Sequence, residues 1–255
     1  MASYGHSFAE LYDVFYAEKP YAKEARFIDE IVRRSRGTGP LDLLELACGT
    51  GNHAFEFERL GYRVTGTDLS ADMIGVAQRK AGQRGSKARF LQADMGTAGE
   101  EDAGYDVVVC LFDSIGYLLE NARIVSCLRN VARRLRPNGI CVLESWHAAA
   151  MLSSREPVRV RHWQVPGAEI VRISETTCQH AEQWCTVRFE VIVTDADGGW
   201  RRFEETHRNR YFLKKEMDLL LESSGLRTRA CYADYRPSEE LTEKSWHLIH
   251  VAEPF

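Results

Sequence analysis

Residues 41–54, LDLLELACGTGNHA, decide the fold of this chain. Four leucines lead into Gly49-Thr50-Gly51, and a helix-compatible segment begins near His53. A chain wraps a nucleotide with this succession of strand, glycine turn and helix. The glycines let the backbone approach the ligand, and the helix N-terminus offers unpaired N–H groups. The stretch therefore predicts a nucleotide site at the end of the first strand.

Strand and helix patterns alternate five times along the first part of the chain. The predicted strands cover residues 41–46, 62–66, 89–93, 105–112 and 140–144. The fourth is a near-continuous apolar run, as expected for a parallel strand covered on both faces. This alternation predicts an α/β fold with a doubly wound, mostly parallel, Rossmann-like sheet.

The pattern changes after about Trp146. Residues 187–194 alternate between apolar and polar, a turn follows at 195–199, and residues 200–212 can return as the partner strand, with another such strand at 170–176. This predicts an antiparallel, β-rich insertion after strand five. Two late strands, at 226–230 and 246–251, would bring the main sheet to seven. We expect four segments: an N-terminal helical flap (1–40), a nucleotide-binding core (41–146), the insertion on the acceptor side (147–212), and a C-terminal helix and strands (213–255).

Composition indicates an ordinary globular protein. A net charge of -4 gives no general reason to expect a nucleic acid partner. No apolar run approaches membrane-spanning length and no leader-like segment opens the chain, so we expect a cytoplasmic protein with no membrane partner. The seven cysteines are scattered and form no CxxC pair, which predicts neither a disulfide framework nor a metal site.

The residues at the strand ends bear on which nucleotide is bound. Residues 49–54 also fit the G-x-G-x-x-A form of a dinucleotide fingerprint. Asp68 follows at about the sequence spacing at which a carboxylate binds the adenosine ribose in such sites. On these residues alone, NAD therefore stays a possible ligand. However, Glu45 precedes the turn and Asp94 ends the third strand. A carboxylate close to a pyrophosphate is repelled, whereas one close to a sulfonium or ammonium is favourable. The three carboxylates favour a cationic adenosyl compound.

Four motifs together resemble a class I S-adenosylmethionine-dependent methyltransferase. They are ELACGTG (45–51), TGTDLSADM (65–73), LQADM (91–95) and RLRPNGICVLES (134–145). The resemblance implies S-adenosylmethionine as the cofactor and a methyl-transferring enzyme. It also implies a set of cofactor contacts, with Asp68 on the ribose hydroxyls, Asp94 and the Met95 backbone on the adenine, and Glu45 toward the methionyl end. The expected cofactor-binding residues are Tyr16, Glu45, Ala47, Gly49, Gly51, Asp68, Asp94, Met95 and Leu111.

A finer resemblance concerns the acceptor. FAELYDVFYAEKPYAKEA (8–25), CLFDSIGYL (110–118) and ESWH (144–147) are similar to the N,N-dimethyltransferases of nucleotide-linked amino sugars, and more distantly to glycine and sarcosine N-methyltransferases. This implies a small-molecule amine acceptor and a possible homodimer. The chain departs from the family at Asp113 (serine), Ser145 (proline) and His147 (tryptophan). Residues 244–247 (KSWH) replace an arginine–glycine pair, which puts a phosphate contact there in doubt.

The acceptor side offers several candidate residues. Transfer from a sulfonium is an in-line displacement in which the thioether leaves without an acid, and an amine acceptor must be deprotonated, so a general base is useful. Tyr117 and His147 follow strands four and five and are the expected catalytic residues, with Glu205 and His207 as further base candidates. The expected substrate-binding residues are Tyr12, Tyr21, Trp146, Glu205 and His207.

Other functions stay open on the sequence. A small-molecule O-methyltransferase, a non-catalytic S-adenosylmethionine-binding module and an NAD-dependent oxidoreductase are the alternatives. A nucleic-acid amine methyltransferase would usually show an Asn/Asp-Pro-Pro-aromatic run after strand four, which Phe112 to Ile115 lacks. A metal-assisted catechol O-methyltransferase needs a carboxylate cluster. The sequence does not clearly supply one, although Asp113 keeps this function from being excluded.

Overall fold

The computed structural model describes residues 4–37, 39–97 and 104–255. Its main sheet has seven strands in the order β10-β11-β5-β4-β1-β2-β3, and a separate sheet has four in the order β6-β7-β8-β9. The main-sheet strands are β1 (Asp42–Leu46), β2 (Arg63–Asp68), β3 (Arg89–Gln92), β4 (Tyr105–Cys110), β5 (Leu135–Trp146), β10 (Leu226–Ala233) and β11 (His247–Pro254). The second sheet consists of β6 (Val158–Val165), β7 (Ala168–Gln179), β8 (Trp184–Asp195) and β9 (Trp200–Arg210).

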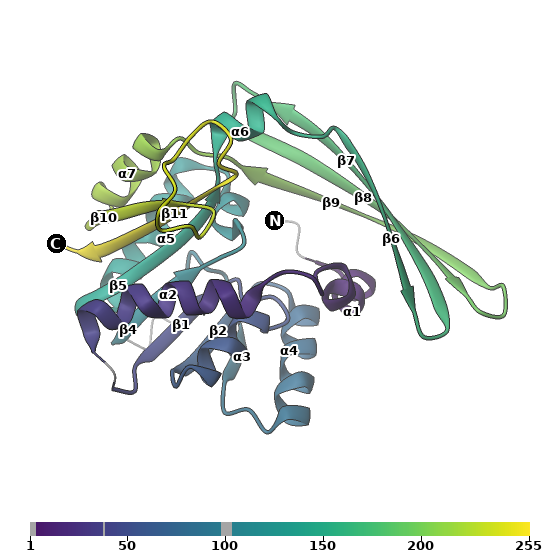
Figure 1. Cartoon of the computed structure of the whole chain (residues 1–255), viewed down its shortest axis with the longest axis horizontal. Helices are drawn as coiled ribbons and strands as arrows, with labels where there is room; N and C mark the ends of the chain where they lie inside the picture. Colours follow the sequence, from purple (N-terminus) through teal and green to yellow (C-terminus); the bar gives the residue numbers. More distant parts are fainter. Residues whose placement is uncertain (1–3, 38, 98–103) are drawn as a thin grey trace.

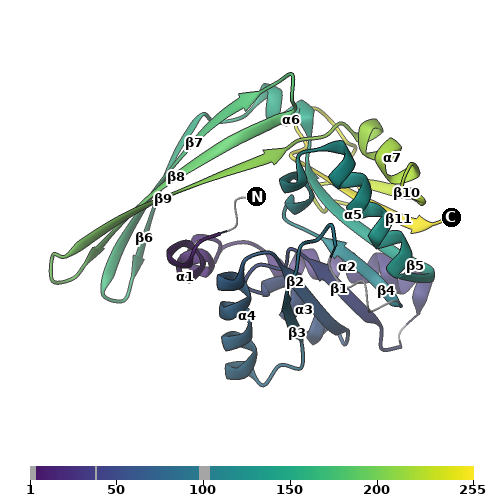
Figure 2. The ribbon, with the colours of Figure 1, turned by 180° about the vertical axis from the view of Figure 1, so that it is seen from behind.

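The helices complete the two layers around the main sheet (Figure 1, Figure 2). They are α1 (His6–Phe15), α2 (Tyr21–Arg36), α3 (Asn52–Arg59), α4 (Ala71–Arg84), α5 (Asn121–Arg134), α6 (Ala148–Ser153) and α7 (Lys214–Glu222), with a short 3-10 helix η1 (Ser114–Leu118). Strands β1 to β5 run parallel, and β11 pairs antiparallel with both β5 and β10. The expected α/β fold, with its seven-stranded sheet and antiparallel insertion, is confirmed.

Side-chain alternation along the central strands builds two cores. Leu43 and Val107 face the layer of α2, α3 and α4, whereas Leu44 and Val108 face α5 and α7. Successive side chains of a strand point to opposite faces, so a strand covered on both sides must be apolar throughout. This explains why β4 is fully buried and reads as a continuous apolar run.

The second sheet extends away from the main sheet, and α1 lies between it and α4 (Figure 1, Figure 2). Phe8 and Phe15 of α1 pack in one cluster with Met73 of α4 and with Ile170 and Val191 of the second sheet. The helix thereby fills the space over the carboxyl ends of the parallel strands. The same edge of a parallel sheet is where ligands bind in open α/β folds.

The sequence analysis missed two features of the insertion. In strand β6 the apolar residues change from one face to the other between Val160 and Trp163, and its first five residues are exposed, so no single apolar face marks it as a strand. The prediction that no disulfide forms is wrong for one pair, because Cys178 is bonded to Cys185. These two cysteines lie opposite each other in the register of β7 and β8, which spacing along the chain does not reveal.

None of the described helices is long and apolar enough to cross a membrane.

The second sheet is anchored to the core where β9 passes η1. Asn209 donates from its amide to the Asp113 carbonyl oxygen over 3.1 Å, and Arg210 donates to the Leu119 carbonyl oxygen over 2.8 Å. Gly116 makes this close approach possible, since a methyl group there would overlap the Asn209 side chain and the Arg210 carbonyl.

We predict opposite effects for two glycine-to-alanine substitutions. Gly116→Ala should lower the free energy of unfolding by about 1–3 kcal/mol, because an added methyl group forces β9 away from η1. Gly82→Ala in α4 should raise it by up to about 1 kcal/mol, because the site is open and alanine favours a helix. Urea unfolding measures both. Equal effects of the two substitutions would contradict the assigned packing.

Candidate active site

A cavity of about 730 Å³ opens at the carboxyl ends of the parallel strands. Its floor is formed by residues that follow β1, β2, β3 and β4, and its cover by tyrosines of the N-terminal segment. The far wall belongs to α6 and to the second sheet. A smaller cavity of about 30 Å³ lies beside it, below the glycine turn.

The glycine turn after β1 has a left-handed backbone at alternate positions. Ala47, Gly49 and Gly51 have φ values of 53°, 55° and 81°. Gly51 is the N-cap of α3, and a side chain there would come within 2.8 Å of the Phe90 ring. Ala47 and Gly49 line the cavity. The turn therefore brings backbone, not side chains, against whatever occupies the floor.

Asp68 closes this turn from the neighbouring strand. Its carboxylate accepts from the Gly49 N–H and the Ser70 N–H, each over 2.8 Å. Burial raises the pKa of Asp68, and these backbone donors oppose the shift. Each carboxylate oxygen keeps a lone pair, so Asp68 can still accept from two hydroxyl groups at the edge of the cavity.

Glu45 is a buried carboxylate that faces the small cavity. Its Oε2 has no hydrogen-bond partner among the described residues, and its Oε1 lies 3.8 Å from His53 Nδ1. Burial, together with the Asp68 charge, raises the pKa of Glu45 to about 8. Glu45 accepts a hydrogen bond from the Ala54 backbone, and its desolvated, unpartnered Oε2 fits the ammonium group of a cationic ligand.

A second pair of charges supports this region from α2. Glu24 contacts His53 Nε2 at 2.7 Å and Lys19 Nζ at 2.6 Å. Burial acts to raise the pKa of Glu24, but His53 and Lys19 outweigh it and lower the pKa to about 2. Lys19 also lies 4.4 Å from the centre of the Phe112 ring. The sequence analysis missed Lys19, which lines the cavity.

Asp94 and Met95 line the opposite end of the floor. The Asp94 carboxylate accepts from the Gly96 N–H over 2.8 Å and from Arg123 over 2.9 Å. Leu111 is buried beside the small cavity with Glu45. Of the nine expected cofactor residues, all but Gly51 line one of the two cavities.

Aromatic side chains cover the cavity. The ring of Tyr16 packs edge-on against Phe112, with 5.0 Å between ring centres, and tilted against Tyr12, with 4.7 Å between ring centres. The hydroxyl groups of Tyr4 and Tyr117 are 2.8 Å apart. Burial raises the pKa of Tyr117, so its phenol stays neutral near pH 7 and can donate or accept one hydrogen bond. Of the other expected substrate-binding residues, Trp146 lines the large cavity, whereas Tyr21 lines the small cavity beside the glycine turn.

The two histidine candidates lie in different surroundings. His147 is absent from the cavity walls, and its Nδ1 lies 3.0 Å from the Ser245 carbonyl oxygen, so this position gives no support for a catalytic role. His207 lines the cavity, and its buried Nδ1 has no partner in the described part of the chain. Its Nε2 lies 3.0 Å from Glu205 Oε2, and the Glu205 Oε1 accepts from the Gly5 N–H over 2.8 Å.

Arginines line the wall opposite the cofactor floor, and the sequence analysis missed them. Arg161 of β6 lies directly across from Arg172 of β7. Arg172 is 5% exposed, its Nε and Nη1 have no hydrogen-bond partner, and its guanidinium lies among the rings of Phe15, Tyr16, Trp163 and Phe189 at 4.8–5.3 Å. Within the described ranges, neither arginine has a carboxylate at ion-pair distance. We call this the arginine wall; it comprises Arg155, Arg159, Arg161 and Arg172.

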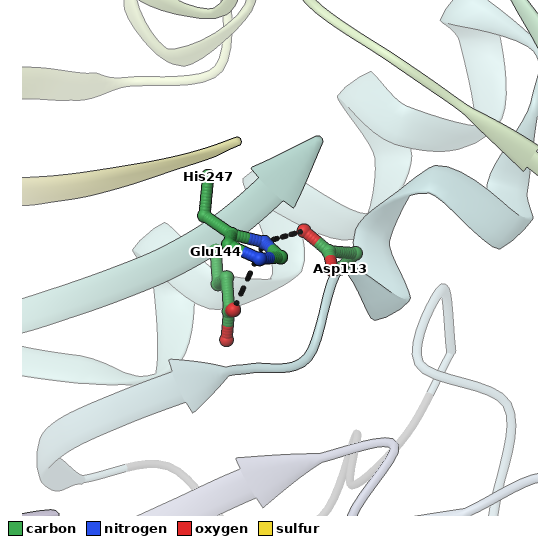
Figure 3. A group of neighbouring side chains, drawn as sticks. All are labelled: Asp113, Glu144 and His247. Atoms are coloured by element: carbon green, nitrogen blue, oxygen red, sulfur yellow. Dashed lines mark hydrogen bonds and ion pairs between the residues drawn. The ribbon is translucent and has the colours of Figure 1, made fainter. Parts of the chain in front are cut away.

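A cluster of three side chains lies at the carboxyl ends of the inner strands β4 and β5, and it consists of Asp113, Glu144 and His247 (Figure 3). His247 Nδ1 is 3.0 Å from Asp113 Oδ1 and 3.3 Å from Glu144 Oε1. The sequence analysis noted Asp113 and the segment containing His247 only as departures from a family pattern. Their juxtaposition depends on the antiparallel pairing of β11 with β5, which no local signal shows.

Comparisons with known proteins agree with this geometry. A family model described as a methyltransferase domain matches residues 43–139. The chain is 30% identical, over 90% of its length and 93% of the relative, to the dTDP-3-amino-3,4,6-trideoxy-alpha-D-glucopyranose N,N-dimethyltransferase of Streptomyces venezuelae. It is 29% identical, over 88% of its length and 86% of the relative, to the dTDP-3-amino-3,6-dideoxy-alpha-D-glucopyranose N,N-dimethyltransferase of Streptomyces fradiae. The crystal structure of Streptomyces venezuelae DesVI superposes on this chain with a TM-score of 0.80 at 25% identity. The superposition covers 100% of each chain.

We predict that Glu45→Gln stabilises the cofactor-free protein at alkaline pH. The folded-state pKa of about 8 lies above the ordinary value of about 4.3. The stabilising contribution of the protonated carboxyl is therefore complete below about pH 4.3 and is lost as the pH rises through about 8. The neutral glutamine keeps its contribution, so the advantage of the variant should grow with pH, at a slope of at most about 1.4 kcal/mol per pH unit.

Urea unfolding of both proteins between pH 5 and 8.5 measures this difference. The exposed Glu240→Gln is the control for a glutamate-to-glutamine change outside the cavity. A Glu45→Gln advantage that is constant, or that grows toward acid pH, would contradict the burial of an unpaired carboxyl.

Proposed function

The chain belongs to the S-adenosylmethionine-dependent methyltransferases that include the dTDP-amino-sugar N,N-dimethyltransferases, and we propose that it methylates the amine of a nucleotide-linked amino sugar. Two relatives named for this activity align over nearly the whole chain. The observation that carries the proposal is the pair Arg161 and Arg172 of the arginine wall, which faces the cofactor floor across one cavity and has no carboxylate at ion-pair distance in the described part of the chain.

The cofactor floor divides into three parts. We assign Asp68 to the ribose hydroxyls, Asp94 and Met95 to the adenine, and Glu45 to the methionyl ammonium. The assignment is supported by the free lone pairs of Asp68 and by the orphaned Oε2 of Glu45. The remaining proposed cofactor contacts are Tyr16, Ala47, Gly49, Gly51 and Leu111.

The bound cofactor supplies a methyl group on a sulfonium, and it leaves as a neutral thioether. The protein then has to align the acceptor nitrogen with the C–S bond, about 3–3.5 Å from the methyl carbon, and exclude water. Tyr12, Tyr16 and Phe112 are suited to this because their packed rings close the cavity above the glycine turn. Tyr117 offers a neutral hydroxyl at the same place.

His207 is the general base that we favour for the acceptor ammonium. Glu205 can accept the Nε2 proton over 3.0 Å, which fixes the tautomer whose Nδ1 carries the free lone pair. That Nδ1 is buried, unpartnered within the described chain, and belongs to a residue that lines the cavity. The assignment moves the base from His147, one of the two expected catalytic residues, to a residue on β9.

The arginine wall indicates an acceptor with an anionic group. Like charges directly opposite each other on one sheet face are unfavourable, and no carboxylate of the described residues lies at ion-pair distance from Arg161 or Arg172. Guanidinium groups bind phosphate through paired N–H donors. The diphosphate of a nucleotide-linked sugar has the charge to satisfy these donors while the sugar amine reaches toward Phe112 and His207.

The outer face of β6 supports the expected homodimer as a further proposal. Val158 and Val160 alternate with the arginines, so they point away from the cavity, and both are more than half exposed. A second copy of the chain could cover them. Light scattering should then report a dimer that Val160→Lys weakens.

A cytoplasmic location and the division into four segments also stay proposals.

Methyl transfer itself is tested with labelled cofactor. We expect label in dTDP-linked amino sugars, and not in the matching sugars that carry a hydroxyl in place of the amine. Asp68→Ala should abolish binding of S-adenosylhomocysteine in calorimetry. Label only in hydroxyl acceptors would refute the amine assignment, and binding of NAD instead of S-adenosylhomocysteine would refute the cofactor.

We predict that His207→Gln lowers kcat by about 10²-fold, the usual contribution of a positioned base. Because the described contacts of His207 are with Glu205, Tyr4, Tyr117, Phe8 and Phe189 and not with Asp68, Asp94 or Met95, S-adenosylhomocysteine affinity should not change. The loss should shrink at alkaline pH, where free amine no longer requires a base. A loss that is equal at all pH values would contradict the assignment.

We predict that Arg161→Gln raises KM for a dTDP-amino sugar by about tenfold and leaves KM for S-adenosylmethionine unchanged, since it removes a phosphate-binding charge. Arg161 is exposed, so the fold should tolerate the change. Arg201→Gln is the matched control, because Arg201 lies on β9 and pairs with Asp195. Equal kinetics for the two variants would argue against a phosphate at this wall.

A further inference from the structure

Three side chains that could hold a metal ion converge from segments far apart in the sequence. Asp113 follows β4, Glu144 lies near the end of β5, and His247 begins β11. Figure 3 shows the imidazole of His247 between the two carboxylates. One ligand atom from each residue lies within 4.8 Å of the other two.

Two of the separations match those of ligands around one ion. First-row metals bind carboxylate oxygen and imidazole nitrogen at about 2.0–2.2 Å, so neighbouring ligand atoms lie about 3.0–3.5 Å apart. His247 Nδ1 lies 3.0 Å from Asp113 Oδ1 and 3.3 Å from Glu144 Oε1. The two carboxylate ligand atoms lie within 4.8 Å of each other, so both can turn toward an ion held by the imidazole.

A second layer of hydrogen bonds fixes two of these ligands. Glu144 Oε2 accepts from the Tyr235 hydroxyl over 2.6 Å and from the Phe112 N–H over 2.5 Å, so Oε1 is left for the cluster. The Asn209 side-chain amide donates to the backbone carbonyl oxygen of Asp113 and holds that residue in place. Metal ligands are typically oriented in this way by outer partners.

The charges also favour a cation. The Asp113 and Glu144 side chains are 3% and 1% exposed, and two buried carboxylates at this distance repel each other unless a positive charge lies between them. The single Nδ1 proton of His247 cannot serve both carboxylates with good geometry. A divalent ion neutralises both and replaces that proton.

We propose that Asp113, Glu144 and His247 bind one divalent first-row metal ion, such as Zn²⁺, Mn²⁺ or Fe²⁺. Two carboxylates with one imidazole suit these ions better than Ca²⁺, which prefers oxygen alone. Asp113 and His247 line the cavity, so the remaining coordination positions face the acceptor. Resting on the proposed function, the ion would hold a hydroxyl oxygen next to the reacting amine of the sugar.

Metal binding tests the site without reference to methyl transfer. The protein is dialysed against EDTA, then against Zn²⁺ or Co²⁺, and its metal content and Co²⁺ absorption spectrum are recorded. We expect one ion per chain. His247→Gln and Asp113→Asn should lose it, and Tyr235→Phe should weaken it by about tenfold, as outer-partner changes do. His6→Gln is the control, because His6 and Asp72 form an exposed pair at 3.3 Å.

Each outcome decides the proposal. Stoichiometric binding by the wild type and His6→Gln, lost in His247→Gln, supports it, provided that His247→Gln still binds S-adenosylhomocysteine and is therefore folded. No ion in the wild type, or equal binding by His247→Gln, overturns it and leaves the cluster as an ion pair. Metal binding without transfer to amino sugars would keep the site and refute the proposed function.

Discussion

Buried carboxylates at one sheet edge determine most of what surrounds them. Glu45, Asp68, Asp113 and Glu144 all lie where parallel strands end. Burial raises the pKa of Glu45, Asp68 and Glu144, which favours their protonation or a nearby cation. The opposite wall holds Arg161 and Arg172 without acidic partners in the described chain. The cavity is therefore negative on its core side and positive on its insertion side. Such a field orients two ligands at once, a cationic cofactor on the floor and an anionic acceptor against the wall.

The cover of the cavity is tied to both sides by polar contacts. The Gly5 N–H donates to Glu205 of the insertion, while the Ser70 hydroxyl donates to the Tyr4 carbonyl oxygen over 2.7 Å. Asp13 of α1 accepts from Thr50 of the glycine turn over 2.6 Å and from Lys80 of α4 over 2.5 Å. Because α1 bridges the cofactor turn and the acceptor wall, a change in either contact moves the aromatic rings above the reacting atoms.

The sequence was most informative where a local pattern suffices. The glycine turn, the acidic strand ends and the apolar β4 are each readable within about ten residues, and the resemblance to known methyltransferases joined them into one cofactor site. What could not be predicted depends on register. Arg161 faces Arg172, Cys178 faces Cys185, and His247 reaches Glu144 only because particular antiparallel strands pair without a shift. A slip of one residue would reverse every side chain of such a strand.

The negative floor raises a chemical problem for an amine acceptor. Carboxylates near the acceptor nitrogen stabilise its ammonium form, which has no lone pair and cannot attack the methyl group. The positive charge of the cofactor offsets Glu45 and Asp68, but Asp113 and Glu144 lie farther along the same sheet edge, at the ends of β4 and β5. Those two carboxylates need their own cation, whether the His247 imidazolium or a metal ion. With the floor neutralised in this way, His207 on the opposite side can accept the ammonium proton and release the lone pair toward the sulfonium.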